Sequence, residues 1–84
     1  MPNDLDELRG RRRAAFGAAL RAARLEAGLT QEALANLAKM DRSFYVELEN
    51  AMHSTTVDRV CDLATALNVP VRQLFEDRVF DAHA

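Results

Sequence analysis

The chain has 84 residues, 49% of them hydrophobic but only 6% aromatic, so it can bury one small core built mainly from Leu, Val and Ala. Its single cysteine excludes an internal disulfide, and no apolar run approaches the roughly 20 residues of a transmembrane helix. We therefore expect a soluble protein of the cytoplasm with no membrane partner. The net charge is -2, but the charges are unevenly distributed along the chain. Residues 9–59 carry a net positive charge, and both ends are acidic.

Apolar residues recur at helical spacing and nowhere alternate as they would in a strand. Asp4 and Glu7 have the spacing of a capping box, so a short helix or turn is predicted to begin there. Gly10 either ends that turn or lies inside one longer helix. A clear helix follows over residues 11–27, and Gly28 stands where a left-handed residue ends a helix. The apolar stripe of this helix is Phe16, Ala19, Leu20, Ala23 and Ala27.

Two short helices are predicted next, joined by about four residues. Thr30 is the expected N-cap of a helix that ends near residue 38, and Asp41 is the expected N-cap of a helix that continues to residue 50. Leu34, Ala35, Ala38 and Met40 are expected in the core, together with Tyr45 and Leu48. The second of these helices then turns Arg42, Ser43, Phe44, Val46 and Glu47 away from the core.

The remaining chain holds two more predicted helices and a tail. Thr55 or Thr56 caps a fourth helix that ends near residue 67, with Val57, Val60, Cys61, Ala64 and Leu67 on its apolar stripe. Pro70 suits the first turn of a last short helix, residues 71–76. The predicted fold is an all-α domain of five helices. Its expected parts are a leader or short helix at residues 1–10, the main domain at residues 11–76 and a tail at residues 77–84.

Nothing in the sequence supports catalysis, and we expect neither a cofactor nor a bound metal. His53 lies in a predicted loop and His83 in the tail, and no group of Cys, His and acidic residues has metal-ligand spacing. Glu47 and Glu49 are two positions apart on a helix, so they face different ways. Cys61 falls on an apolar stripe and is expected to be buried.

The pair of helices between residues 30 and 50 is typical of a helix-turn-helix. The stretches GLTQEALA, residues 28–35, and DRSFYVELEN, residues 41–50, resemble the lambda-repressor-like or Cro/C1-type (XRE) helix-turn-helix family. The segments VDRVCDLATAL, residues 57–67, and NVPVRQLF, residues 68–75, match the family's closing segments. The resemblance covers about residues 14–76. It implies a DNA-binding regulator of transcription from a bacterium or phage, associated with the nucleoid.

The resemblance implies that residues 41–50 form a recognition helix in the major groove of double-stranded DNA. Arg42, Ser43 and Glu47 are then the expected readers of base edges. Arg42 can donate two hydrogen bonds to guanine, and a carboxylate can accept from the cytosine amino group. Phe44 and Val46 are expected against thymine methyl groups or the sugar wall. Further expected DNA contacts are Thr30, Gln31, Lys39, Asn50, His53 and Ser54.

Two further expectations come from the resemblance. Arg24 and Glu49 match a pair that forms a partly buried ion bridge in relatives, so we assign them a structural role. Most relatives have glycine at the position of Ala51. Because alanine disfavours a left-handed backbone, Asn50 is expected to adopt that conformation instead, which would shift the loop that follows.

The DNA-facing surface carries few cations, so a monomer should bind one half-site weakly. We therefore predict a homodimer on a near-palindromic operator with half-sites about one helical turn apart. The expected interface residues are Leu74, Phe75, Val79 and Phe80. The alternative function is a protein-interaction module such as the antitoxin of a toxin–antitoxin pair, whose tail would bind a protein partner.

Overall fold

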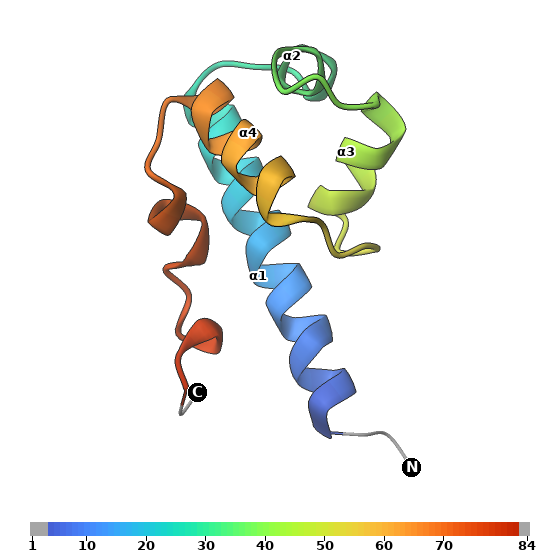
Figure 1. Cartoon of the computed structure of the whole chain (residues 1–84), viewed down its shortest axis with the longest axis vertical. Coiled ribbons are helices and arrows are strands. Elements are labelled where there is room, and N and C mark those ends of the chain that lie inside the picture. Colours follow the sequence, from blue (N-terminus) through green and yellow to red (C-terminus); the bar gives the residue numbers. More distant parts are fainter. Residues whose placement is uncertain (1–3, 83–84) are drawn as a thin grey trace.

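A computed structural model describes residues 4–82, and within this range the chain is helical and contains no strand (Figure 1). Four α-helices are followed by two short 3-10 helices, η1 and η2. Their bounds are α1 Asp4–Glu26, α2 Gln31–Leu37, α3 Arg42–Glu49, α4 Val57–Leu67, η1 Val71–Phe75 and η2 Arg78–Phe80. The all-α class is as predicted, but the count of five helices is not confirmed, because the segment after Pro70 is a 3-10 helix. Parts of the predicted leader and tail, residues 1–3 and 83–84 with His83, lie outside the described residues.

The N-terminal helix α1 is a single element of 23 residues that continues through Gly10. The longer of the two alternatives for this segment is therefore the observed one. Three acidic side chains in its first turn, those of Asp4, Asp6 and Glu7, complement the positive end of the helix dipole. The helix ends at Glu26, and Gly28 adopts the predicted left-handed conformation with φ of +73°. Among residues 4–82 no helix is long and apolar enough to cross a membrane.

Side-chain caps begin the next three helices, as the sequence predicts. Thr30 Oγ1 accepts a hydrogen bond from the backbone N–H of Ala33 at 3.0 Å, and Asp41 Oδ2 accepts one from Phe44 at 3.2 Å. Of the two threonines proposed for α4, Thr56 is the cap and accepts from the N–H of Arg59 at 3.2 Å. Each such cap satisfies a backbone donor that has no partner within its helix.

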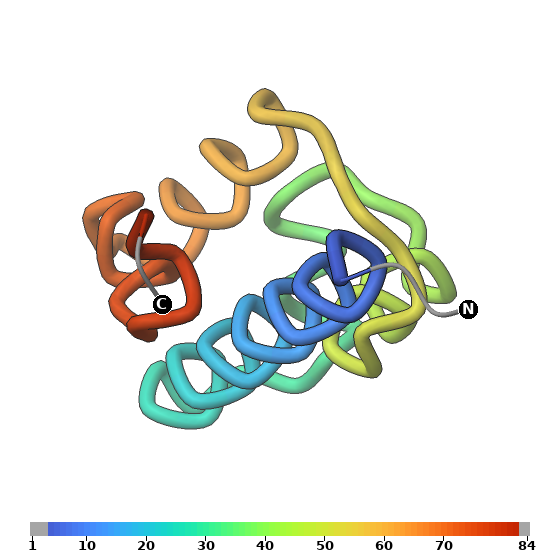
Figure 2. The backbone as a smooth tube through the Cα atoms, turned by 90° about the horizontal axis from the view of Figure 1, so that it is seen from below, coloured from blue at the N-terminus to red at the C-terminus, as the bar shows by residue number. Residues whose placement is uncertain are grey.

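The core lies where α1 crosses the other helices. Figure 2 shows α1 between α3 on one side and the C-terminal segment on the other, and α1 contacts α3, η1 and η2. The side chains that are almost fully enclosed come from every α-helix and from η1: they are Leu20, Leu34, Tyr45, Leu48, Leu63 and Leu74. Met40, in the joint between α2 and α3, is 6% exposed and belongs to this core as predicted.

Three residues assigned to apolar stripes are exposed instead. On α4, Val57 is 78% exposed and Cys61 also faces solvent. The buried residues of this helix are Val60, Leu63, Ala64 and Leu67, whose spacing of three or four places them on one face. Val57 lies in the first turn, beyond the edge of the core, and Cys61 lies to the side of the buried face. Ala27 follows the end of α1 and is exposed.

Candidate nucleic-acid interface

The C-terminal end of α3 is seated directly on α1, at Gly17. A Cβ atom at this position would lie 2.6 Å from the carbonyl oxygens of both Leu48 and Glu49, closer than real side chains approach. Gly17 is buried, and the absence of a side chain is what lets the two backbones meet. Sequence analysis missed this residue. The available signal was a glycine adjacent to Phe16, inside the buried stripe of a helix.

An ion pair fastens the same end of α3 to α1. Arg24 Nε donates to Glu49 Oε2 at 2.7 Å and Arg24 Nη2 donates to Glu49 Oε1 at 3.1 Å, a two-pronged contact. Arg24 Nη1 also donates to the carbonyl of Leu29 at 3.0 Å. The side chains are 10% and 3% exposed, so the pair lies largely out of water. The structure thus brings together the two residues to which the resemblance gave a structural role.

Glu49 accepts two more hydrogen bonds, which tie α2 into the same cluster. The Tyr45 hydroxyl donates to its carboxylate from within α3, and Gln31 Nε2 donates to Oε1 at 3.2 Å. Burial alone would raise the pKa of Glu49, but the hydrogen bonds from Arg24, Tyr45 and Gln31 outweigh it and lower that pKa. Burial, followed by the bond to Glu49, raises the pKa of Tyr45, so the hydroxyl stays protonated and remains a donor. The hydrogen bond to Glu49 raises the pKa of Arg24.

The outer face of α3 has a graded exposure. Arg42 and Ser43, in its first turn, are exposed, while Phe44, Val46 and Glu47 are half-buried. All five of these side chains were predicted to point away from the core, and only Arg42 and Ser43 are exposed. Among the other expected DNA contacts, Thr30, Lys39 and Asn50 are exposed and Gln31 is half-buried. Lys39 lies in the turn between α2 and α3 with a left-handed φ of +57°.

Phe44 and Glu47 are half-buried because side chains from outside α3 cover them. The ring of His53, in the loop before α4, stacks on Phe44 with centroids 5.8 Å apart and planes 9° from parallel. The guanidinium carbon of Arg59, from the first turn of α4, lies 4.9 Å from the centroid of Phe44. His53 Nε2 lies 2.7 Å from Glu47 Oε2. The fold gathers these four residues, which come from α3, the following loop and α4, into one group.

The loop after α3 corrects one expectation. Ala51 itself adopts the left-handed conformation with φ of +62°, whereas Asn50 has φ of -87°. The N–H of Ala51 donates to the carbonyl of Leu48 at 3.2 Å and the N–H of Met52 donates to that of Glu47 at 2.9 Å. These two bonds close the end of the helix and require a left-handed residue at position 51, whatever its side chain. The loop that carries His53 therefore keeps the path that a glycine would give it.

Aromatic side chains gather on another face, at the C-terminal segment. The ring of Phe75 stacks on Phe16 with centroids 5.4 Å apart, and Phe80 meets Phe75 edge-on at 5.0 Å. Leu74 is fully buried, so it belongs to the core and cannot be part of the predicted dimer interface. Phe75 is 36% exposed. Val79 and Phe80 are half-buried.

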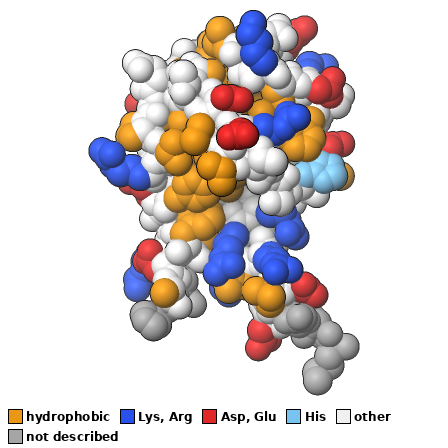
Figure 3. Space-filling model, in the orientation of Figure 1, with side chains coloured by type: hydrophobic (Ala, Val, Ile, Leu, Met, Phe, Trp, Pro, Cys, Tyr) orange, Lys and Arg blue, Asp and Glu red, His pale blue; other side chains and the backbone are white. Residues whose placement is uncertain are grey.

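A hollow of about 230 Å³ opens beside these rings, and we call it the apolar hollow. Most of its wall is hydrophobic, and two arginines of α1 stand at its edge. Its lining includes Arg12, Arg13, Phe16, Val57, Phe75 and Phe80. Figure 3 shows a hydrophobic patch on this side of the molecule with basic side chains directly below it.

Comparison with known proteins gives matches over most of the chain. A family model described as a helix-turn-helix domain matches residues 15–76. The crystal structure of the restriction-modification controller protein C.AhdI from Aeromonas hydrophila is similar, with a TM-score of 0.74 and 38% identity over 75% of this chain and 96% of that one. Two structures of the clp gene regulator ClgR from Corynebacterium glutamicum have TM-scores of 0.74 and 0.73 at 28% identity, and the matches cover 76% of this chain and 68% or 83% of theirs. No curated protein matches at a significant level.

Proposed function

Because the chain belongs to the Cro/C1-type helix-turn-helix family, we propose that it regulates transcription by binding a specific operator through α3 in the major groove. The observation that carries this proposal is the seating of α3. Its inner side is held against α1 at Gly17 and by the Arg24–Glu49 pair, while Arg42 and Ser43 at its start are exposed. A recognition helix needs this combination, since base edges are read accurately only by side chains on a rigid support.

Arg42 and Ser43 are the proposed principal readers of base edges. Both lie in the first turn of α3, and the N-terminal residues of a recognition helix are the ones that reach the bases. Arg42 is exposed and can donate two hydrogen bonds to one guanine. Glu47, one turn further along, is the proposed acceptor for a cytosine amino group. The exposed parts of Phe44 and Val46 are proposed to contact thymine methyl groups or the sugar wall.

Contacts to the phosphate backbone are proposed for the residues that flank α3. Lys39 stands exposed in the turn before the helix, and Asn50 stands exposed directly after it. Thr30 and Gln31 lie at the start of α2. Because Nε2 of Gln31 already donates one hydrogen bond to Glu49, the amide is oriented by the core and its second N–H is available to a phosphate. Such contacts set the register of the protein on DNA, and the cation Lys39 among them adds to the salt-dependent part of the affinity.

We further propose a homodimer on a near-palindromic operator. The support is the apolar hollow, where Phe75 and Phe80 leave partly exposed apolar surface beside Val57, which is 78% exposed. Val79, half-buried next to Phe80 in the chain, is also proposed for the interface. Sedimentation equilibrium at tens of micromolar would test this. Val57→Glu should shift the protein towards monomer because it places a charge in the interface. Leu25→Glu, at a residue 53% exposed and outside the hollow, is the matched control and should leave the dimer intact.

Among small regulators, a controller of a restriction–modification operon is favoured over a phage-type repressor or an autoregulatory switch. The chain matches 96% of the length of C.AhdI, which is described as such a controller. It would act on bacterial or phage DNA in the cytoplasm. The antitoxin alternative expects a tail that becomes ordered only on a protein partner. Here Phe80 packs on Phe75 and η2 contacts α1, which favours the regulator.

Selection of binding sites from random double-stranded DNA tests the proposal directly. Enrichment of one near-palindromic sequence, with an affinity that falls steeply as salt rises, is the expected result. The spacing of its half-sites should be about one helical turn, roughly 34–36 Å. If the folded protein enriches no sequence at low salt, the proposal is wrong. A protein-binding role for the outer face of α3 would then be examined by pull-down from the native host.

A further inference from the structure

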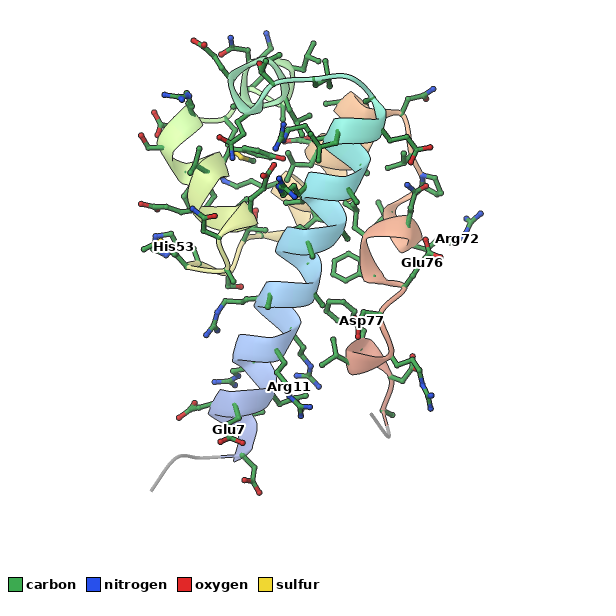
Figure 4. The ribbon with its side chains drawn as sticks, turned by 180° about the vertical axis from the view of Figure 1, so that it is seen from behind. Glu7, Arg11, His53, Arg72, Glu76 and Asp77 are labelled. Atoms are coloured by element: carbon green, nitrogen blue, oxygen red, sulfur yellow. The ribbon has the colours of Figure 1, made fainter. Side chains whose placement is uncertain are left out.

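The carboxylate of Glu47 does not project freely from α3. Its Oε2 lies 2.7 Å from Nε2 of His53, a polar contact that joins the loop before α4 to the outer face of α3. The side chains are 38% exposed for Glu47 and 49% for His53, so the pair lies at the surface. Figure 4 shows His53 on the loop beside α3. A polar contact this exposed adds little to folding stability.

His53 is itself held in place by Phe44. The two rings are nearly parallel, with an interplanar angle of 9° and a centroid separation of 5.8 Å. Phe44 and Glu47 are three positions apart on α3, so they lie side by side on one face of the helix. The guanidinium of Arg59 contacts Phe44 from α4, 4.9 Å from the ring centroid. The imidazole therefore has two partners on α3, Phe44 against its ring plane and Glu47 at its Nε2.

This arrangement restricts a side chain that would otherwise be mobile. A glutamate has several rotatable bonds, and reading a base requires its carboxylate in one position. The contact with His53 Nε2 is made by Oε2, so the second carboxylate oxygen, Oε1, lies outside this contact and can accept from a base. Glu47 is thus oriented before DNA arrives.

We infer that His53 is a positioning residue for sequence discrimination: it holds the Glu47 carboxylate and so sets the preference at the base pair that Glu47 faces. The inference rests on the proposed function and deepens it. It differs from the expectation that His53 contacts the DNA backbone, because a phosphate contact strengthens binding to all sequences alike. A positioning residue changes discrimination at one base position.

The test uses the selected operator and a set of variants changed at each base pair of the half-site. Affinities are measured for the wild type and for Glu47→Ala, His53→Phe and His53→Gln. His53→Phe keeps an aromatic ring on Phe44 but cannot donate to Glu47, whereas His53→Gln retains an N–H donor. His53 is half exposed, so both variants should fold, and thermal unfolding checks this.

The wild type should discriminate at the Glu47 position by roughly 5- to 150-fold, the range of a good base contact. Glu47→Ala and His53→Phe should each bring this ratio close to one at the same base pair and leave the others unchanged. A double variant that combines Glu47→Ala with His53→Phe should show the same ratio as either single variant, because both changes remove the same interaction. His53→Gln should retain most of the wild-type discrimination at this base pair, because its amide can still donate to Glu47.

The inference is overturned if His53→Phe weakens binding to every operator by one factor and leaves the ratios between operators intact. That result identifies a phosphate contact. It is also overturned if Arg42→Ala relaxes a base position while Glu47→Ala and His53→Phe relax none, and in that case the proposed function stands. Failure to select any operator with the wild type overturns the inference and the proposed function together.

Discussion

Replacing Gly17 with alanine would place a methyl group between the backbones of α1 and α3. The new Cβ would lie 2.6 Å from two carbonyl oxygens, those of Leu48 and Glu49, while ordinary contact begins at 3.4 Å. The helices must therefore separate by about 0.8 Å at this point, and the opposing atoms are backbone that cannot rotate away. Such overpacking costs about 3 kcal/mol, at the upper end of the usual range, because no side chain can yield.

Alanine is also a better helix former than glycine, and this difference stabilises the folded variant by about 1 kcal/mol. The net loss in the free energy of unfolding is then about 2 kcal/mol, equivalent to a fall in Tm of roughly 8–16 °C for a domain of this size. Gly10→Ala is the matched control, since its Cβ would approach only the flexible end of Arg13, at 3.9 Å. That variant should gain about 0.5–1 kcal/mol from helix propensity alone.

Thermal and urea unfolding of the wild type and both glycine variants, followed by circular dichroism, measure the two effects. The variants should move in opposite directions from the wild type. Because α3 is seated at Gly17, the destabilised variant should also bind the operator more weakly at temperatures where it remains folded. If Gly17→Ala raised Tm as much as Gly10→Ala, the close approach of α1 and α3 and the reasoning built on it would be refuted.

Three other changes test separate features. Ala51→Gly should raise the free energy of unfolding by about 0.5–1 kcal/mol in urea titrations, because Ala51 has φ of +62°, and an unchanged midpoint would count against this strain. Glu49→Gln should lower the free energy of unfolding by about 3 kcal/mol at neutral pH, since the change leaves Arg24 without its charged partner. The folded-state pKa of Glu49 is lowered, so its contribution is complete above its ordinary pKa of about 4.5 and is lost as pH falls below that value. The gap between wild type and Glu49→Gln should therefore narrow in acid, and a gap independent of pH would contradict this account. Arg42→Ala should relax one base position of the operator by about 1–3 kcal/mol in a binding titration, and a uniform loss across all sequences would make Arg42 a phosphate contact instead.

Local signals in the sequence were sufficient for the helices and their ends. The caps Thr30 and Asp41 act on backbone groups only three residues away, and Gly28 acts within one turn, so neighbouring residues alone predict them. The spacing of Tyr45 and Leu48 likewise places the opposite face of α3 outward, which is how Arg42 was found. The family could be named from these features because its motif is itself a pattern of local structure.

Tertiary contacts decided the rest. Which face of a helix is buried depends on the elements that pack against it. Cys61 and Val57 are therefore exposed, although helical spacing alone allowed them to be buried. The left-handed conformation of Ala51 is imposed by the closing bonds of α3 against the intrinsic preference of alanine.

The same holds for the groups that shape the candidate interface. Gly17 contacts α3 from more than 30 positions earlier in the chain, and His53 reaches Glu47 only because the loop after Ala51 folds back along α3. The sequence by itself determined which helix is proposed to read DNA, because the position and outward face of that helix depend on period and capping within a few residues. The folded chain decided which side chains hold that helix and orient its carboxylate, because those contacts join segments that no local rule connects.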